Sequence, residues 1–182
     1  MPNKPREYDP ENEQPLRDIS TDIKIVGYTS FSGARHFVTF VDRCTRFVAV
    51  YFIEKKSDVA EAWNQYLAWS VRQGFVVKTV SVDGGGEFWS TKTADGQLIN
   101  EHDLAAFEYV CKHNPTGREI EVVRTPGSGH SDMNPLAERY HKKITDLSNA
   151  MLYHARLGPS FWEWAVRKIP PKISRRKTSI LV

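Results

Sequence analysis

Three short apolar runs stand close together in the first third of the chain, and they constrain its fold more than any other feature. Apolar and polar side chains alternate over residues 18–26, and residues 36–41 and 47–53 are rich in Val, Phe and Ile. Such runs favour β-strands. Short connections of this kind are typical of antiparallel neighbours. The sequence therefore predicts an antiparallel meander of three strands, the first of which ends at Gly27.

Helix-like and strand-like segments alternate after the meander. Ser57 and Asp58 offer side chains for the N-cap of a helix, and Gly74 is a typical residue to end it. The other expected elements in this part are a helix over 103–111 and strands over 75–82 and 120–123. Strands that alternate with helices indicate an α/β protein.

The clearest helix signal comes last in the chain. Asn134 is suited to the N-cap and Pro135 to the first helical position. The apolar residues that follow are three or four apart and predict one buried stripe: Leu136, Tyr140, Ile144, Leu147 and Met151. Glu138 lies off that stripe, and the side chains that share its face are His141, Lys142, Thr145 and Asn149. This polar, basic face suits a metal site beside a phosphate backbone, and a solvated helix face is the alternative.

The bulk composition is that of a soluble globular domain. The chain has 182 residues, of which 40% are hydrophobic and 26% charged. It contains no apolar run long enough to cross a membrane, and its start lacks the apolar core of a signal peptide. We therefore expect an intracellular protein, nuclear or cytoplasmic, without a membrane partner. Its two cysteines are too few for a disulfide framework or a structural zinc site.

The two ends of the chain differ in composition from the part between them. Residues 1–17 are rich in proline and polar side chains, which predicts a disordered linker before a core domain over 18–168. Six basic residues and no acidic ones follow Glu163. The tail over 169–182 is therefore expected to be basic and able to neutralise phosphates, with a solvated, frayed tail as the alternative.

Three acidic residues stand in separate elements. Asp22 is in the first strand, Asp83 follows the strand over 75–82, and Glu138 is in the first turn of the last helix. Three carboxylates from different elements can form a hard-oxygen site for two Mg²⁺ or Mn²⁺ ions, which is the basis of metal-dependent phosphodiester chemistry. Simpler interpretations are a turn residue for Asp83 and a residue that complements the helix dipole for Glu138. Asp18, four positions earlier in the same strand, points to the same face of the sheet as Asp22. It is the alternative candidate for the first acidic residue of the site.

Four local sequences, in this order, resemble copia-type retrotransposon integrases, relatives of retroviral integrases and DDE transposases. They are GARHFVTFVD at 33–42, DGGGEF at 83–88, NPLAER at 134–139 and FWEWAV at 161–166. The resemblance covers roughly residues 18–168. It implies an α/β ribonuclease H-like fold with a five-stranded mixed sheet, three strands antiparallel and two parallel, flanked by helices.

The resemblance also implies a function and a set of site residues. The chain would be an integrase catalytic core, a polynucleotidyl transferase that trims retroelement DNA ends and joins them to target DNA, and it would act as a homo-oligomer. Asp22, Asp83 and Glu138 would be catalytic and hold two Mg²⁺ or Mn²⁺ ions. The residues expected to contact DNA are His141, Lys142, Thr145 and Asn149.

The sequence differs from the family pattern at several motif positions, so a second function is an alternative. Gly84 stands in place of the usual Asn, Pro135 in place of Gly, and Tyr140-His141 in place of Lys-Asn. The Gly-Pro that usually follows the first acid is absent after Asp22. The alternative is a decayed or domesticated integrase fragment that binds nucleic acid or a partner without catalysis. A free-standing ribonuclease H is less favoured because those enzymes use a different acidic pattern.

Two further expectations concern structure alone. Asp42 is expected to cap the turn between the second and third strands. The tryptophans at helical spacing are expected to lie in the core or at an interface: Trp63, Trp69, Trp162 and Trp164.

Overall fold

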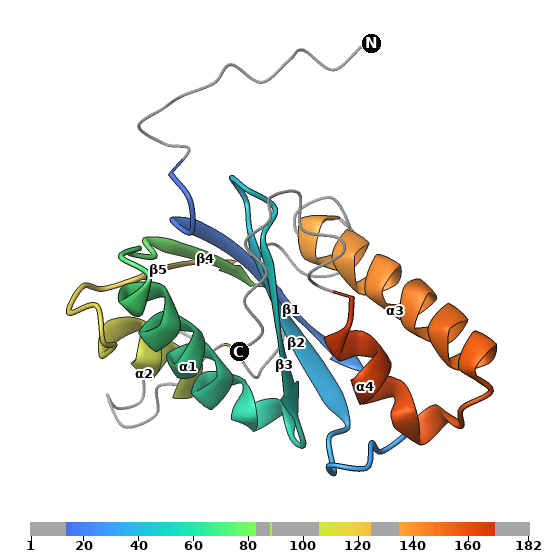
Figure 1. Cartoon of the computed structure of the whole chain (residues 1–182). Helices are drawn as coiled ribbons and strands as arrows, with labels where there is room; N and C mark the ends of the chain where they lie inside the picture. Colours follow the sequence, from blue (N-terminus) through green and yellow to red (C-terminus); the bar gives the residue numbers. More distant parts are fainter. Residues whose placement is uncertain (1–13, 83–87, 89–105, 125–134, 170–182) are drawn as a thin grey trace.

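A five-stranded mixed sheet lies between two pairs of helices (Figure 1). The computed structural model describes residues 14–82, 88, 106–124 and 135–169. The strands are β1 (Asp18–Ile25), β2 (His36–Asp42), β3 (Val48–Ile53), β4 (Thr79–Val82) and β5 (Glu121–Arg124). The main helices are α1 (Val59–Arg72), α2 (Ala106–Lys112), α3 (Pro135–Ala155) and α4 (Trp162–Arg167).

The strand order β3-β2-β1-β4-β5 places β1 at the centre of the sheet. The first three strands pair antiparallel, and β4 and β5 join the sheet in parallel. The predicted architecture, with three antiparallel strands and two parallel ones, is therefore confirmed. An acidic side chain in the middle of β1, such as Asp22, therefore stands on the central strand, where it pairs with Thr39 of β2.

The β2–β3 turn is closed by Asp42, as expected. Its carboxylate is fully buried and accepts hydrogen bonds from the backbone N–H of Thr45 (2.8 Å) and of Cys44 (3.2 Å). Arg46 takes a left-handed φ of 65° next to this turn. These contacts fix the register of the meander on which the rest of the sheet is built.

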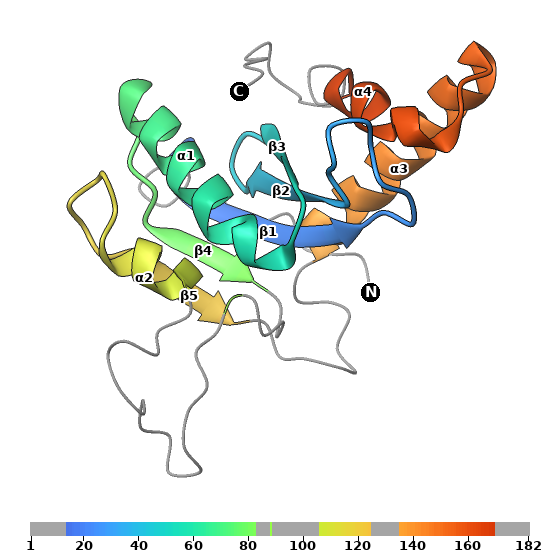
Figure 2. The same ribbon diagram turned by 90° about the horizontal axis from the view of Figure 1, so that it is seen from below.

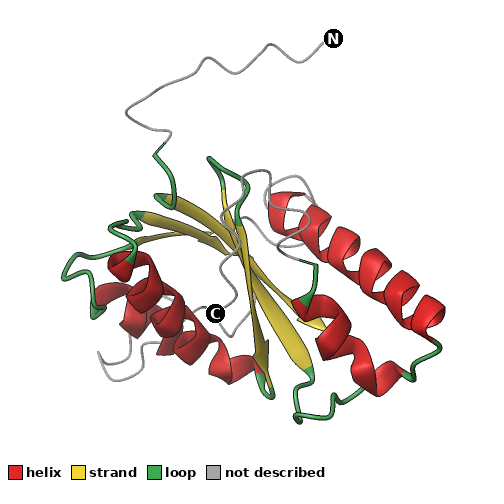
Figure 3. Ribbon diagram, viewed as in Figure 1, coloured by secondary structure: helices red, strands yellow, loops and turns green. Residues whose placement is uncertain are grey.

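Helices cover both faces of the sheet, and each face has its own apolar core. Figures 2 and 3 show α1 and α2 on one face and α3 and α4 on the other. On the α1 side the rings of Phe40, Trp63 and Tyr66 pack together, with Phe40 5.0 Å from Trp63 and 4.9 Å from Tyr66 between ring centroids. On the other side Ile144 and Trp162 are buried against β2 and β3. Strands β2 and β3 contribute side chains to both cores and so are packed on both faces.

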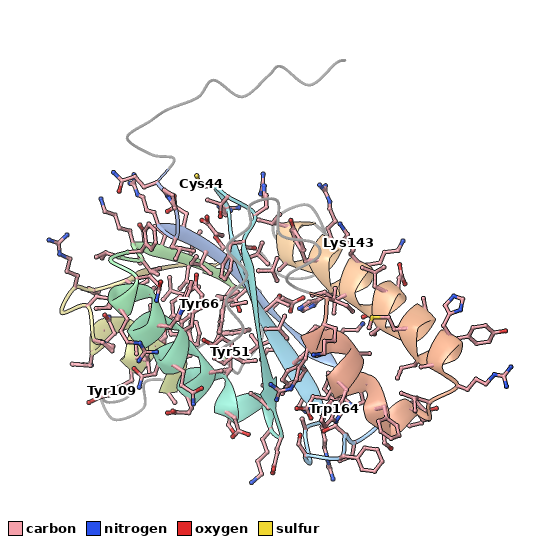
Figure 4. The ribbon with its side chains drawn as sticks, viewed as in Figure 1. Cys44, Tyr51, Tyr66, Tyr109, Lys143 and Trp164 are labelled. Carbon is pink, nitrogen blue, oxygen red and sulfur yellow. The ribbon has the colours of Figure 1, made fainter. Side chains whose placement is uncertain are left out.

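Three of the four tryptophans that were expected in the core or at an interface lie inside these cores. Trp63, Trp69 and Trp162 are buried, whereas Trp164 is 62% exposed on α4 (Figure 4). Neighbouring residues on a helix face different directions, so Trp162 can be buried in the second core while Trp164 faces solvent.

The boundaries of α1 and β4 differ from those predicted. Asp58 does not cap α1 with its side chain. A short 3₁₀ helix (Lys56–Asp58) precedes α1, and the Asp58 carboxylate accepts a hydrogen bond from the Lys55 backbone N–H instead (2.9 Å). Gly74, with a φ of +79°, follows the helix as expected. β4 begins at Thr79 rather than at residue 75, because Thr79 is the partner of Asp18, where β1 itself begins.

The buried face of α3 is also rotated from the predicted stripe. Tyr140 and Ile144 are buried, but Leu147 is 38% exposed. The buried face instead includes small and polar residues together with apolar ones: Ala137, His141, Ser148 and Leu152. Small side chains allow a helix to approach a sheet closely, and a stripe read from apolar residues alone does not include them. This rotation turns His141 toward the sheet.

The packed domain reaches slightly beyond the expected limits of 18 and 168. Leu16 is 4% exposed and Ile169 is 1% exposed, and both belong to the buried cores. The first residues of the predicted helix over 103–111 and the tail from 170 onward lie outside the described residues. No helix in the described part of the chain has the length and apolar character needed to cross a membrane.

Candidate active site

A cleft of about 480 Å³ lies between β1 and α3. Its walls contain two of the three predicted acids and three of the four predicted DNA contacts. The residues that line it are Asp22, Ile23, Lys24, Ile25, Glu138, His141, Lys142, Thr145 and Asp146. Asn149 is exposed further along α3 and does not line the cleft. The central strand and the longest helix thus bring Asp22 and Glu138 to one place although 116 positions separate them in the sequence.

Asp22 lies in the middle of β1, where it is the partner of Thr39 on β2. Its side chain is 20% exposed. Oδ1 accepts a hydrogen bond from the Ile23 backbone N–H (2.7 Å), and Oδ2 lies 3.1 Å from Nδ1 of His141. Both carboxylate oxygens therefore have a fixed partner, and the side chain still faces the cleft.

Asp18, the alternative first acid, occupies a different environment. Its Oδ1 accepts a hydrogen bond from Oγ1 of Thr79 (2.5 Å) at the start of β1, and it does not line the cleft. Asp22 is four positions after Asp18, which is about 13 Å along an extended strand. The cleft therefore favours Asp22 as the partner of Glu138.

Glu138 is exposed in the first turn of α3, at the wall of the cleft. Asp83, the third predicted acid, lies outside the described residues. Among the residues that are described, no group of three or more His, Cys, Asp or Glu side chains could hold a metal ion. The convergence of all three acids stays a prediction.

His141 lies deeper than the sequence predicted. A contact with a DNA backbone requires an exposed side chain, but His141 is 5% exposed. Its Nε2 is 2.9 Å from Oγ1 of Thr39, and its ring packs edge-on against Phe37 at 5.3 Å between centroids. The rotation of α3 buries this ring between the helix and β1–β2.

Several cleft residues were not predicted from the sequence. Lys24 is exposed on β1, and Asp146 is exposed one turn after Lys142 on α3. Asp146 could have been found, because it is eight positions after Glu138 and so lies close to the same helix face. Ile25, 58% exposed, adds an apolar wall. Oγ1 of Thr145 is buried without a hydrogen-bond partner among the described residues.

This arrangement combines carboxylates with cations in one open cleft. Asp22 and Glu138 offer hard oxygen ligands of the kind that Mg²⁺ and Mn²⁺ prefer. Lys24 and Lys142 offer charges that attract a phosphate group. The cleft therefore brings carboxylate oxygens and lysine ammonium groups together between β1 and α3.

Comparison of the sequence with known proteins finds retrotransposon polyproteins. No protein-family model matches the chain. Over 139 residues, 76% of this chain, it is 30% identical to the retrovirus-related Pol polyprotein from transposon TNT 1-94 of Nicotiana tabacum, of which it covers 9%. It is 25% identical over 172 residues, 93% of the chain, to the Pol polyprotein from transposon RE2 of Arabidopsis thaliana, of which it covers 10%. The chain thus spans about a tenth of the length of these curated relatives.

Comparison of the fold finds retroviral integrases. The HTLV-2 integrase catalytic core domain in complex with magnesium, in its trimeric form, matches with a TM-score of 0.54 and 17% identity over 87% of this chain and 85% of that one. The dimeric form gives a TM-score of 0.56 with 16% identity over 88% of both chains. A chain of the simian T-cell lymphotropic virus intasome in complex with the PP2A regulatory subunit B56 gamma gives 0.60 with 13% identity over 98% of this chain and 54% of that one.

The two comparisons agree with the four sequence motifs. At these identities the structural matches show the fold, and the sequence matches show that the chain is similar to part of retrotransposon Pol polyproteins. The resemblance to retrotransposon integrase catalytic cores is therefore confirmed: the sequence relatives are retrotransposon Pol polyproteins, and the fold is that of a retroviral integrase catalytic core domain.

Proposed function

We propose that this chain is the catalytic core of a retrotransposon integrase, which trims retroelement DNA ends and joins them to target DNA. The observation that carries the proposal is the shared cleft, in which Asp22 from the central strand and Glu138 from α3 lie with two lysines. The relation to retrotransposon Pol polyproteins and the integrase fold support the same reaction class.

Asp83 is proposed as the third acid of this cleft. Ser20 on β1 is the partner of Ser81 on β4, and the two strands run parallel. Asp22 is two positions after Ser20, and Asp83 is two positions after Ser81. A parallel register that continued for two more residues would bring the two acids to neighbouring strands at the same level of the sheet.

The residues of the cleft fit divalent metal ions. The proposed ligands of two Mg²⁺ or Mn²⁺ ions are Asp22, Asp83 and Glu138, and the HTLV-2 core domain to which the chain is similar in fold was solved in complex with magnesium. Two such ions, when bound, supply electrostatic stabilisation of the attacking and leaving oxygens in a phosphodiester displacement.

The protein's own residues bind and orient the DNA in this scheme. Lys24 and Lys142 contact backbone phosphates from the two sides of the cleft, and Thr145 and Asn149 extend the same helix face. Such contacts position a strand without reading its sequence. Water is the attacking group in end trimming and a DNA 3′-hydroxyl in joining; in each case one P–O bond forms as another breaks, and the departing oxygen carries the electron pair away. We propose a homo-oligomer as the active form, as the core domain of HTLV-2 was solved in dimeric and trimeric forms.

The test is a DNA-joining assay with purified protein and a 3′-hydroxyl duplex in Mn²⁺. Wild-type protein is expected to produce joined strands, and Glu138→Gln and Asp22→Asn are expected to produce none while they retain the circular dichroism spectrum of the wild type. Glu61→Gln, an equal charge change at an exposed position of α1 on the other face of the sheet, is the matched control and should stay active.

A wild-type protein that is folded and binds DNA but never joins it would overturn the enzymatic proposal. That outcome would leave the second function, a decayed or domesticated fragment that binds nucleic acid without catalysis. The motif departures at Gly84 and at Tyr140-His141 are the sequence features that favour this alternative.

A further inference from the structure

We propose that His141 and Thr39 are positioning residues, which orient the Asp22 carboxylate for metal binding through a fixed chain of hydrogen bonds. The inference rests on the proposed function. It assigns to His141 a role inside the protein in place of the DNA contact that the sequence suggested.

The chain of contacts runs through three elements of the fold. Nδ1 of His141 on α3 lies 3.1 Å from Oδ2 of Asp22 on β1. Nε2 of the same ring lies 2.9 Å from Oγ1 of Thr39 on β2. Thr39 is also the direct strand partner of Asp22. The ring therefore spans a cross-strand pair and has one nitrogen on each member.

The chemistry of the partners sets the direction of the chain. A carboxylate only accepts hydrogen bonds, so Nδ1 of His141 carries the proton and donates to Asp22. In neutral imidazole Nε2 is then the acceptor, and the Thr39 hydroxyl donates to it. A partner on the second nitrogen is what fixes the tautomer and the orientation of a histidine. Thr39 thereby presents the Nδ1 donor to Asp22.

Burial makes this arrangement rigid. Thr39 is fully buried, His141 is 5% exposed, and the ring edge of His141 packs against Phe37. A buried ring with both nitrogens bonded cannot turn over without loss of both bonds. The position of the Nδ1 donor is accordingly determined by the packing of α3 on β1 and β2.

The result is a carboxylate whose plane is fixed. His141 bonds to Oδ2 of Asp22, and the Ile23 backbone N–H bonds to Oδ1 at 2.7 Å. An ionised carboxylate has about four acceptor positions. Two of these positions on Asp22 accept hydrogen bonds within the protein. Each carboxylate oxygen therefore has a further lone pair that can bind a cation in the cleft. Partners outside the ligand shell that orient ligands in this way typically change metal affinity or activity about 10- to 100-fold when they are lost.

Two variants of similar chemistry distinguish positioning from packing. In His141→Asn the amide nitrogen can lie near the place of Nδ1 and donate to Asp22, whereas in His141→Gln the longer side chain carries its amide toward the place of Nε2 and Thr39. Thr39→Val keeps the shape of Thr39 and removes only the hydroxyl. Ser148→Ala removes a buried hydroxyl of α3 whose hydrogen bond is to the Thr145 carbonyl oxygen, and it serves as the control.

The measurement is Mn²⁺ affinity by isothermal titration calorimetry on the full chain, without DNA and without turnover. We expect His141→Gln to weaken Mn²⁺ binding about 10- to 100-fold, His141→Asn to stay within a few-fold of wild type, and Ser148→Ala to leave the affinity unchanged. Nitrogen-15 spectra of the wild type should show that the neutral form of the His141 ring carries its proton on Nδ1. Thr39→Val, which preserves the volume of the core, should weaken Mn²⁺ binding and broaden the nitrogen-15 signals of the His141 ring.

Equal Mn²⁺ affinity in wild type, His141→Gln and Thr39→Val would overturn the inference and leave the proposed function intact. Equal loss in the Asn and Gln variants would also overturn it, because packing alone would then explain the effect. If His141→Gln did not fold, Thr39→Val would replace it in the test. Weaker Mn²⁺ binding in Thr39→Val would support the inference, and unchanged Mn²⁺ binding would overturn it. A wild type that bound no Mn²⁺ would overturn the proposed function and this inference with it.

Discussion

Replacing Glu163 by Gln is expected to destabilise the fold at neutral pH and less so in acid. Glu163 lies on α4 and is 4% exposed. Its Oε2 accepts hydrogen bonds from Oγ of Ser30 (2.8 Å) and from Oγ of Ser32, and its Oε1 accepts one from Nη2 of Arg167 (2.7 Å). The Glu163 carboxylate thus links α4 by hydrogen bonds to the connection between β1 and β2.

The pKa of Glu163 gives the pH dependence its sign. Burial alone would raise this pKa, but the hydrogen bonds from Ser32, Arg167 and Ser30 and the charge of Arg167 together lower it below its ordinary value. A carboxyl group with a lowered pKa in the folded state contributes stability that is present above the unfolded pKa of about 4.3. That contribution is lost as the pH falls from there through the folded pKa.

The size of the effect follows from the contacts. Gln removes the charge and places an amide donor toward either the two serines or Arg167, all of which donate. Hydrogen bonds to a charged group contribute about 1.5–3 kcal/mol, so a loss of about 2 kcal/mol at pH 7 is expected. For a chain of this length this corresponds to a fall in Tm of about 4–8 °C.

Urea unfolding at a series of pH values from 7 downward measures this prediction. The difference in unfolding free energy between wild type and Glu163→Gln should narrow once the pH falls below about 4.3. Glu61→Gln, on the exposed face of α1, should stay within about 0.5 kcal/mol of wild type throughout. If Glu163→Gln were as stable as wild type at pH 7, or if the difference in unfolding free energy kept its size at every pH, the Glu163 carboxylate would not stabilise the fold as described.

Three further predictions concern the core, the thiols and the tail. Trp63→Ala, which removes a ring packed on Phe40 at 5.0 Å, should cost about 3–5 kcal/mol in urea unfolding, and a cost below about 1 kcal/mol would contradict the packing described. Ellman's reagent should label the exposed Cys44 quickly in native protein and Cys111 only on unfolding, because burial raises the pKa of the Cys111 thiol to about 12. Deletion of residues 170–182 should flatten the salt dependence of DNA binding in filter-binding titrations and leave Tm nearly unchanged, so a fall of many degrees would show that the tail belongs to the core.

The elements that carry the candidate site were predictable because their signals are local. Apolar patterning is enough to find β1 and β2, and the signals at Asn134 and Pro135 place the start of α3. The position of Asp22 in the middle of the first strand follows from that strand alone.

The environment of the site was not predictable in the same way, because it depends on how elements pack. The rotation of α3 is set by Ala137 and Ser148, whose small side chains face the sheet where an apolar stripe would have placed Leu147. The burial of His141 and its bond to Asp22 follow from that rotation. A pattern of apolar residues contains no signal for a helix face made of small and polar side chains.

Anomalous X-ray diffraction from Mn²⁺-soaked crystals would show whether Asp22 and Glu138 hold the same divalent ions. We expect anomalous peaks within bonding distance of carboxylate oxygens of both residues, in the cleft between β1 and α3. Peaks at Asp18 in place of Asp22, or a cleft without Mn²⁺ at concentrations that saturate the protein in solution, would contradict this expectation.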